Sequence, residues 1–200
     1  MPTQSKSRRE EYAELTRAAL VSAGSDRFAE QGYAKTSIMQ IADDARVSKG
    51  AFYHHFSDKK ALLKAVLNEA CDRSATKIEE AVASQSESGD LVSAALDAAM
   101  EAIQVDGQYR ELRQQSVGVL DDDERRELDN RIRVPLVSKI FDRLEGQGQL
   151  RDDVDLSAAT VLVVGLLETA LDDMTTSDDP TKRYSELRPI LLGFINSLTG

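Results

Sequence analysis

Apolar side chains recur at intervals of three and four residues along most of the chain, and this spacing limits its fold more than any other feature. In the first such segment, roughly residues 9–31, Leu15, Ala19, Leu20 and Phe28 fall near one face of a helix. Clusters of valine and isoleucine are short, and no alternation with a period of two residues indicates a strand. The pattern predicts an all-α protein with about nine helices.

The expected helices are separated by glycines, prolines and polar clusters. We place them at about residues 9–31, 38–45, 49–56, 59–84, 91–105, 108–120, 124–145, 158–174 and 181–198. Gly32 is expected to end the first helix in a left-handed conformation, and residues 84–90 are expected to form a loop. Pro135 and Pro189 fall inside predicted helices, where a proline kinks or breaks the helix.

The composition excludes several classes of protein. A single cysteine, Cys71, rules out an intramolecular disulfide and a CxxC zinc site, and we expect it to be a packed thiol on a helix. No apolar run approaches the roughly 18 residues of a membrane span. The basic N-terminus lacks the apolar stretch of a secretory signal. These features predict a cytoplasmic protein without a membrane segment.

Two short helices joined by a tight connection are expected within residues 36–60, with the connection near residues 44–47. This is the spacing of a helix-turn-helix, whose second helix enters the major groove of DNA. In that helix Phe52 and Phe56 lie four residues apart, so both can anchor it in the core. The segment therefore predicts a DNA-binding element.

The other side of this second helix carries small and polar residues. Gly50 and Ala51 let the backbone approach base edges, while Tyr53, His54 and His55 offer hydrogen-bond donors. Lysines follow at positions 59 and 60, where the helix dipole alone would favour acidic residues, so a nearby phosphate is expected. Adjacent histidines point about 100° apart on a helix and lack further ligands, so we expect no metal site.

The net charge of −10 argues against a nucleic-acid partner only on average. Residues 1–64 carry a net charge of +3, whereas residues 65–200 carry −13. The basic excess therefore lies on the predicted DNA-binding part, and the acidic excess lies on the remainder.

The segment from about Leu20 to Leu67 resembles the N-terminal domain of TetR/AcrR-type helix-turn-helix transcriptional regulators. The likeness is carried by Gly32-Tyr33, Thr36-Ser37, Ile41-Ala42, Val47-Ser48-Lys49-Gly50, Phe52-Tyr53-His54-His55-Phe56 and Lys59. The resemblance implies a DNA-binding domain with a basic N-terminal arm at residues 1–57 and a helical effector-binding and dimerisation domain at residues 58–200. Members of the family are homodimers, usually repressors released from DNA by a small molecule, and are not enzymes.

The resemblance also implies which residues contact DNA. These are Thr36, Ser37, Arg46, Ser48, Lys49, Gly50, Ala51, Tyr53, His54, His55 and Lys59. Phosphate contacts are implied for Thr36, Ser37, Tyr53, His55 and Lys59, and the others would face the groove or the turn. The sequence departs from the family pattern in three places. Gly24 replaces a common alanine, Arg27 replaces an apolar residue, and Arg46 replaces a common glycine at the turn.

The C-terminal helices are expected to form a dimer seam and an effector pocket. The family builds its dimer interface from its last two long helices, which implies contacts by Val161, Gly165, Glu168, Leu171, Leu191, Phe194, Ile195 and Leu198. Candidate pocket residues on the intervening helices are Met100, Ile103, Tyr109, Leu112, Arg113, Val117, Val137, Phe141 and Leu166. Arg113 is a candidate partner for an anionic effector. Ordinary core packing is the competing interpretation for each of these residues.

The expected function is a ligand-responsive transcriptional repressor that binds a palindromic DNA operator as a homodimer and is released by a small-molecule effector. No cofactor and no catalytic set is expected, since the sequence has no nucleophile motif. An activator or a regulator of many targets would use the same residues. A helical small-molecule-binding protein without specific DNA binding is the alternative from a different class.

Overall fold

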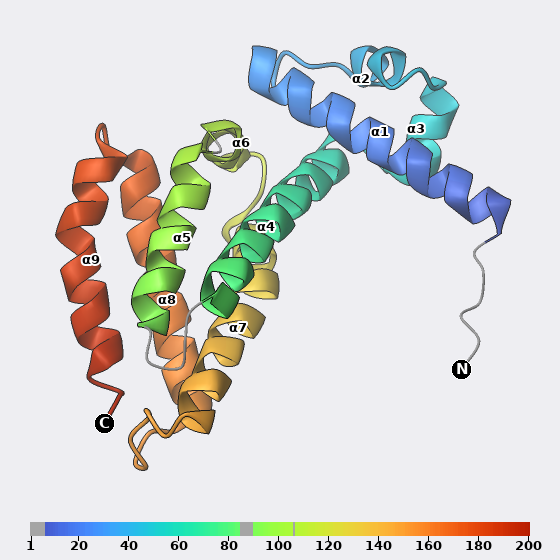
Figure 1. Ribbon diagram of the computed structural model, residues 1–200. Coiled ribbons are helices and arrows are strands. Elements are labelled where there is room, and N and C mark those ends of the chain that lie inside the picture. The colour runs from blue at the N-terminus through green and yellow to red at the C-terminus, as the bar shows by residue number, and fades with distance from the viewer. Residues whose placement is uncertain (1–6, 85–89, 106) are drawn as a thin grey trace. The chain divides into compact units, whose positions relative to one another are not determined.

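The computed structural model describes residues 7–84, 90–105 and 107–200, with the side chains of residues 102–109 left out of the description (Figure 1). The regular structure within these residues is helical, apart from two isolated bridges. The helices are α1 (Arg8–Gln31), α2 (Ile38–Asp44), α3 (Lys49–His55), α4 (Lys59–Ser84), α5 (Leu91–Val105), α6 (Gly107–Ser116), α7 (Asp122–Gly146), α8 (Leu156–Thr176) and α9 (Pro180–Asn196). The predicted all-α class is confirmed.

Parts of the sequence-based picture lie outside the described residues. The start of the predicted basic arm falls at residues 1–6, and most of the predicted loop falls at residues 85–89. In the described part of the chain, no helix is both long and apolar enough to cross a membrane.

The chain forms two compact units, which we call the N-terminal and the C-terminal unit. The N-terminal unit comprises Met1–Glu69 and Glu111–Asp121, and the C-terminal unit comprises Ala70–Arg110 and Asp122–Gly200. The division falls inside α4, so this helix belongs to both units. The functional boundary predicted at residues 57 and 58 stays a prediction, because compactness alone does not define a functional domain.

The core of the N-terminal unit brings α1, α2, α3 and the first turns of α4 together (Figure 1). Phe28 of α1 and Phe52 of α3 are fully buried, and Phe56 is nearly so. The rings of Phe52 and Phe56 lie 5.8 Å apart between centroids. Burial of these rings removes a large apolar area from water, and it fixes α3 against α1. The anchoring predicted for both phenylalanines is confirmed.

Local signals set the ends of the short helices. Ser37 caps α2 in a reciprocal box with Gln40, and Ser48 caps α3 by accepting the Ala51 N–H at 3.1 Å. Gly32 ends α1 with φ of 83° and ψ of 155°, so the left-handed helical conformation expected there is wrong. Glycine alone tolerates this mirror-image extended conformation at low cost, and the chain can then turn into α2.

Two residues of α1 that differ from the pattern of the resembled family, Gly24 and Arg27, have structural reasons. A Cβ at Gly24 would lie 2.7 Å from Cδ2 of the buried Leu62, so the missing methyl group allows α1 to approach α4 closely. Arg27 forms a forked ion pair with Asp44 at the end of α2, with one N–O distance of 2.9 Å. A planar guanidinium suits this geometry, and the pair joins two helices that an apolar residue would join by packing.

In the C-terminal unit, α7 packs against α8, and α9 packs against both α5 and α8. The core contains Leu91, Leu96, Val137, Phe141, Leu144, Val163, Leu191 and Ile195. Pro135 lies within α7 and Pro189 within α9, and both helices continue through the proline, so the predicted break does not occur. Asp155 caps α8 by accepting the Ala158 N–H at 2.8 Å.

Candidate nucleic-acid interface and ligand cavity

One face of α3 is exposed and polar. Lys49 and His54 are exposed, and the side chain of Tyr53 is half exposed. The Lys49 ammonium lies 5.9 Å from the centre of the Tyr53 ring, which gives these two side chains a common direction. Opposite this face, Phe52 is fully buried. The arrangement presents hydrogen-bond donors on a rigid helix whose other side is held in the core.

The turn between α2 and α3 depends on Arg46. This exposed residue has φ of 55°, in the left-handed region. Its N–H donates to the carbonyl of Asp43 at 3.0 Å, and the next N–H, of Val47, donates to Ala42 at 2.9 Å. A residue with a Cβ is strained in this conformation by about 1–2 kcal/mol. An arginine at this turn, just before α3, therefore comes at a cost to the backbone.

Thr36 does not reach the surface. Its side chain is buried, and its hydroxyl lies 2.9 Å from the carbonyl oxygen of Gly32 and 3.2 Å from that of Arg27. The contact with phosphate expected from Thr36 is not available to this side chain in the observed conformation. Ser37 is the exposed hydroxyl at this end of α2, although it also accepts the Gln40 N–H at 3.2 Å.

Lys59, the first residue of α4, binds the connection between α1 and α2. Its ammonium donates to the carbonyl oxygens of Tyr33 at 2.6 Å and Thr36 at 2.7 Å. It also lies 4.2 Å from the centre of the Tyr33 ring. Burial lowers the pKa of Lys59 below its usual range. Lys59 therefore holds the N-terminal unit together, and the phosphate contact predicted for it stays a prediction.

His55 is half-buried at the end of α3, and burial lowers its pKa. The neighbouring His54 and Arg17 lower this pKa further through their charges. The lowered pKa favours the uncharged imidazole of His55, which can offer a neutral hydrogen bond to a phosphate rather than a positive charge.

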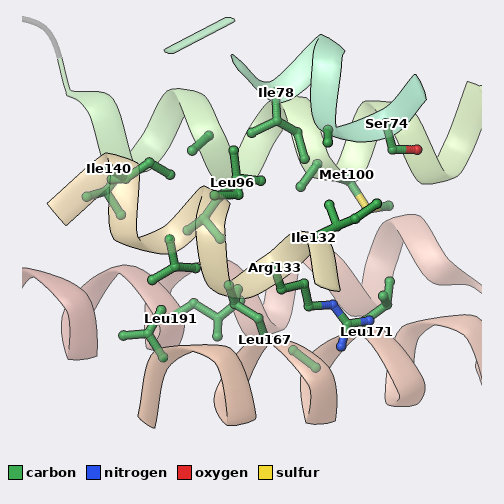
Figure 2. Close-up of a pocket in the computed structure, with 18 of the residues that line it drawn as sticks. Ser74, Ile78, Leu96, Met100, Ile132, Arg133, Ile140, Leu167, Leu171 and Leu191 are labelled. Carbon is green, nitrogen blue, oxygen red and sulfur yellow. The ribbon is translucent and has the colours of Figure 1, made fainter. Parts of the chain in front are cut away.

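A cavity of about 180 Å³ lies inside the C-terminal unit (Figure 2). Its wall is formed by α4, α5, α7, α8 and α9 and is mostly apolar. The lining includes Ile78 of α4, Leu96 of α5 and Leu167 of α8. Met100 of α5 adds a flexible thioether. Such an apolar hollow between packed helices is a common form of ligand site in helical proteins.

One charged pair interrupts the apolar wall. Asp129 and Arg133 lie four residues apart on α7, and their side chains are 6% and 14% exposed. The Asp129 Oδ2 and Arg133 Nη2 atoms are 3.2 Å apart. Figure 2 shows Arg133 extending from α7 toward Leu171. The cavity therefore combines an apolar body with one polar end.

A row of apolar side chains is exposed on α8 and α9. Val161 is 69% exposed, Leu162 60% and Ile190 65%, and Phe194 is also exposed. The two helices pack against one another, so these residues belong to one part of the C-terminal unit. Large exposed apolar side chains that gather in this way are typical of a protein interface.

The model of one known protein family matches part of the N-terminal unit. The model of the family described as "Bacterial regulatory proteins, tetR family" matches residues 20–66, which include α2, α3 and the first turns of α4. Residues 20–66 are therefore similar to the N-terminal domain of the tetR family. The resemblance found in the sequence is confirmed.

Curated relatives are similar to this chain over an N-terminal segment. The uncharacterised HTH-type transcriptional regulator YuxN of Bacillus subtilis is 47% identical over 51 residues, which are 26% of this chain and 18% of YuxN. The chain thus spans less than half the length of the curated relatives it matches.

Solved structures resemble almost the whole chain. A tetR-family transcriptional regulator from Pectobacterium atrosepticum has a TM-score of 0.75 and 24% identity, covering 97% of this chain and 98% of that protein. The regulator RolR, solved in complex with resorcinol, has a TM-score of 0.70 and 20% identity, covering 96% of this chain and 90% of RolR. These likenesses show that the C-terminal unit also has the fold of tetR-family proteins.

The predicted pocket residues of this chain fall into three groups. Met100, Val137 and Phe141 line the cavity. Ile103 and Tyr109 lie outside the described side chains. The remaining four residues do not line the cavity. Leu112, Arg113 and Val117, from α6 and the segment after it, belong to the N-terminal unit, and Leu166 of α8 packs against the core of the C-terminal unit.

Sequence reasoning missed the charged pair of the cavity and its α4 wall, which includes Cys71 and Ser74. A signal for the pair was present. Asp129 and Arg133 lie on the same face of α7 as the buried Val137 and Leu144, a face on which the helical period predicts apolar residues. Charged residues on an apolar stripe indicate a paired or ligand-facing site.

The residues predicted to form the dimer interface differ in their solvent exposure. Val161, Gly165 and Phe194 are exposed, and Glu168 is half-buried. The others face the protomer itself, since Leu171 lines the cavity, Leu191 and Ile195 belong to the core, and Leu198 packs against it. Leu162 and Ile190, which the sequence did not single out for the dimer interface, are also exposed on these two helices.

Proposed function

We propose that this tetR-family protein is a ligand-responsive transcriptional repressor, which binds a palindromic operator as a homodimer and is released by a small molecule bound in the cavity. The observation that carries the proposal is the exposed polar face of α3, held in place by the buried Phe52. A helix fixed in this way can enter the major groove, where its side chains read base edges.

The connection between the two units supports ligand control. Lys59 and Leu62, near the start of α4, hold the N-terminal unit, while Cys71, Ser74 and Ile78 of the same helix line the cavity. A ligand that changes the position of the cavity wall would therefore move a helix that continues into the DNA-binding unit. Coupling of this kind is typically about 1–3 kcal/mol.

The exposed apolar residues of α8 and α9 favour the proposed homodimer, in which a second copy of the chain would cover them. Two copies related by a twofold axis would present two α3 helices to half-sites about one helical turn apart, roughly 34–36 Å. A palindromic operator follows from this symmetry.

The proposal is tested by measuring binding to the DNA upstream of the protein's own gene, by fluorescence anisotropy at several salt concentrations. We expect a specific complex that a scrambled duplex does not form. The Lys49→Ala variant should weaken specific binding by about 1–3 kcal/mol, which corresponds to roughly 5–150-fold, because it removes a base or phosphate contact.

The matched control is Lys182→Ala, which removes the same charge from an exposed lysine on α9. We expect its affinity to stay within about twofold of the parent, since long-range charge effects are screened at physiological salt. Equal losses in both variants, or equal binding to the scrambled duplex, would contradict a specific role for α3.

A further inference from the structure

The polar end of the cavity has hydrogen-bond donors that the described protein atoms do not satisfy. The Arg133 Nη1 and Nη2 atoms are both buried, and neither has a hydrogen-bond partner among the described residues. Asp129 Oδ2 lies 3.2 Å from Nη2 at an angle that gives an ion pair without a hydrogen bond. Buried donors left in this state are unfavourable, so the site favours a molecule that supplies an oxygen acceptor.

The charge of the pair limits which acceptor is suitable. Asp129 already balances the charge of Arg133, so a bound carboxylate would leave one net negative charge in an apolar cavity. An unbalanced buried charge is strongly unfavourable. A neutral hydroxyl group avoids this problem, because its oxygen accepts from Arg133 and its proton is donated to the Asp129 carboxylate.

The size of the cavity limits the rest of the molecule. A cavity of about 150 Å³ lined by aliphatic and aromatic side chains holds one benzene ring. The cavity here, at about 180 Å³, is slightly larger and its wall beyond the charged pair is mostly apolar. It therefore matches a single ring with one or two small substituents.

We propose that the cavity binds a neutral one-ring phenol, with the ring against Ile132, Leu167 and Leu171 and the hydroxyl between Asp129 and Arg133. The inference rests on the proposed role of the cavity as the effector site, and it names the chemical class of the effector. Because phenols ionise near the pKa of tyrosine, about 10, the ligand is neutral at pH 7.

Titration calorimetry of the full-length protein, without DNA, tests the inference with three probes of similar size: phenol, toluene and benzoate. Phenol should bind at least tenfold more tightly than toluene, because toluene leaves the Arg133 donors unsatisfied. Phenol should exceed benzoate by a similar factor, because benzoate brings an unbalanced charge. Toluene binding as tightly as phenol, benzoate binding more tightly, or no binding of phenol would each overturn the inference.

A double variant isolates the charged pair. Asp129→Leu together with Arg133→Met replaces the pair by apolar side chains, a change that folded proteins often tolerate. The preference for phenol over toluene should disappear, while toluene still binds and so reports an intact cavity. The same substitutions at the exposed Asp72 and Arg131 ion pair, with Asp72→Leu and Arg131→Met, should leave the preference unchanged. Retention of the preference in the cavity variant would show that the pair does not select the ligand.

These measurements separate the inference from the proposed function. Calorimetry without DNA reports the chemistry of the cavity whether or not the protein regulates a gene. Adding phenol to the operator complex then tests the effector role, which predicts release of the DNA. If phenol binds and the complex persists, the ligand class stands and the effector role fails.

Discussion

Single residues in the N-terminal unit show how the backbone constrains the DNA-binding surface. Arg46 adopts a left-handed conformation that glycine adopts more easily, and Gly24 sits where a methyl group would collide with Leu62. In the sequence, Gly24 stands out only because it replaces an alanine that is common in the resembled family. The structure adds the close contact, so the absence of a side chain has a packing role.

Arg46→Gly should stabilise the protein by about 1 kcal/mol, because it relieves the strain of the left-handed conformation. The same change should weaken DNA binding and reduce its salt dependence, since one cation leaves the proposed interface. Chemical denaturation and binding titrations measure the two effects. Arg46→Ala is the control, as it removes the charge and keeps a Cβ. Equal stability of the two variants would contradict the strain at this position.

At the scale of elements, polar contacts join helices that are distant in sequence. Asp97 of α5 accepts hydrogen bonds from Arg188 of α9 at 2.7 Å through two nitrogens, and from the Tyr184 hydroxyl at 2.8 Å. In the N-terminal unit, Gln115 accepts the Tyr33 N–H at 2.7 Å and donates to the Phe28 carbonyl at 2.9 Å. Each set fixes one helix against another at a defined register.

The Asp97 contacts predict a pH dependence. Arg188, followed by Tyr184 and Ser93, lowers the pKa of Asp97 in the folded state, despite an opposing effect of burial. A carboxyl with a depressed pKa contributes stability above its unfolded pKa, near 3.9, and loses it as pH falls through the folded pKa. Asp97→Asn should therefore lower stability by about 1 kcal/mol at pH 7.

The difference between parent and Asp97→Asn should begin to shrink as pH falls below about 4, where the unfolded chain takes up the proton first, and should be lost once pH falls through the lowered pKa of folded Asp97. Urea unfolding at a series of pH values measures this effect. Asp72→Asn offers a control, since Asp72 has an exposed ion pair with Arg131. A difference that stayed constant down to pH 2 would contradict the assignment to ionised Asp97.

Gln115→Ala should destabilise the N-terminal unit by about 2 kcal/mol, because it removes two hydrogen bonds to backbone groups at the end of α1. Hydrogen exchange checks this result at the Tyr33 amide, which donates to Gln115 in the parent. Exchange there should become faster, while amides of α8 keep their protection. Gln114→Ala changes the adjacent exposed residue and serves as the control. Unchanged exchange at the Tyr33 amide would contradict the stabilising role of the Gln115 hydrogen bonds.

At the scale of the molecule, charge and apolar surface are distributed unequally. The net charge is +3 over residues 1–64 and −13 over residues 65–200. In the proposed complex, the acidic part would be repelled by DNA and the basic part attracted, which favours approach by α3. The exposed apolar residues of α8 and α9 would meet their counterparts in a second copy.

Gly165→Trp should convert the proposed dimer to monomer. Beyond its chain neighbours and the nearby backbone of α8, no described atom lies within 4 Å of a Cβ at Gly165, so the protomer has room for a side chain that would separate two packed copies. Sedimentation velocity measures the association state, and circular dichroism checks the helices. Gly146→Trp is the control, because Gly146 is also open and lies at the end of α7. An intact dimer of Gly165→Trp would contradict an interface at this face.

Sequence reasoning was most successful where interactions are local. The helical period and the anchoring of Phe52 and Phe56 depend on residues within a few positions of each other. It was least successful for the cavity, whose wall comes from five helices. Arg113 was chosen as the cation for an effector, yet it lies in α6 in the N-terminal unit, whereas Arg133 lies at the cavity.

The sequence by itself determined the all-α class and the helix-turn-helix, since both follow from period, capping and short-range spacing. Only the tertiary structure decided that Thr36 is buried, that Lys59 binds two backbone carbonyls, and that Arg133 has buried, unsatisfied donors. These properties arise from contacts between segments far apart in the chain. The helical period states which face of a helix is apolar, whereas the packing of several such faces sets which polar groups are enclosed with them.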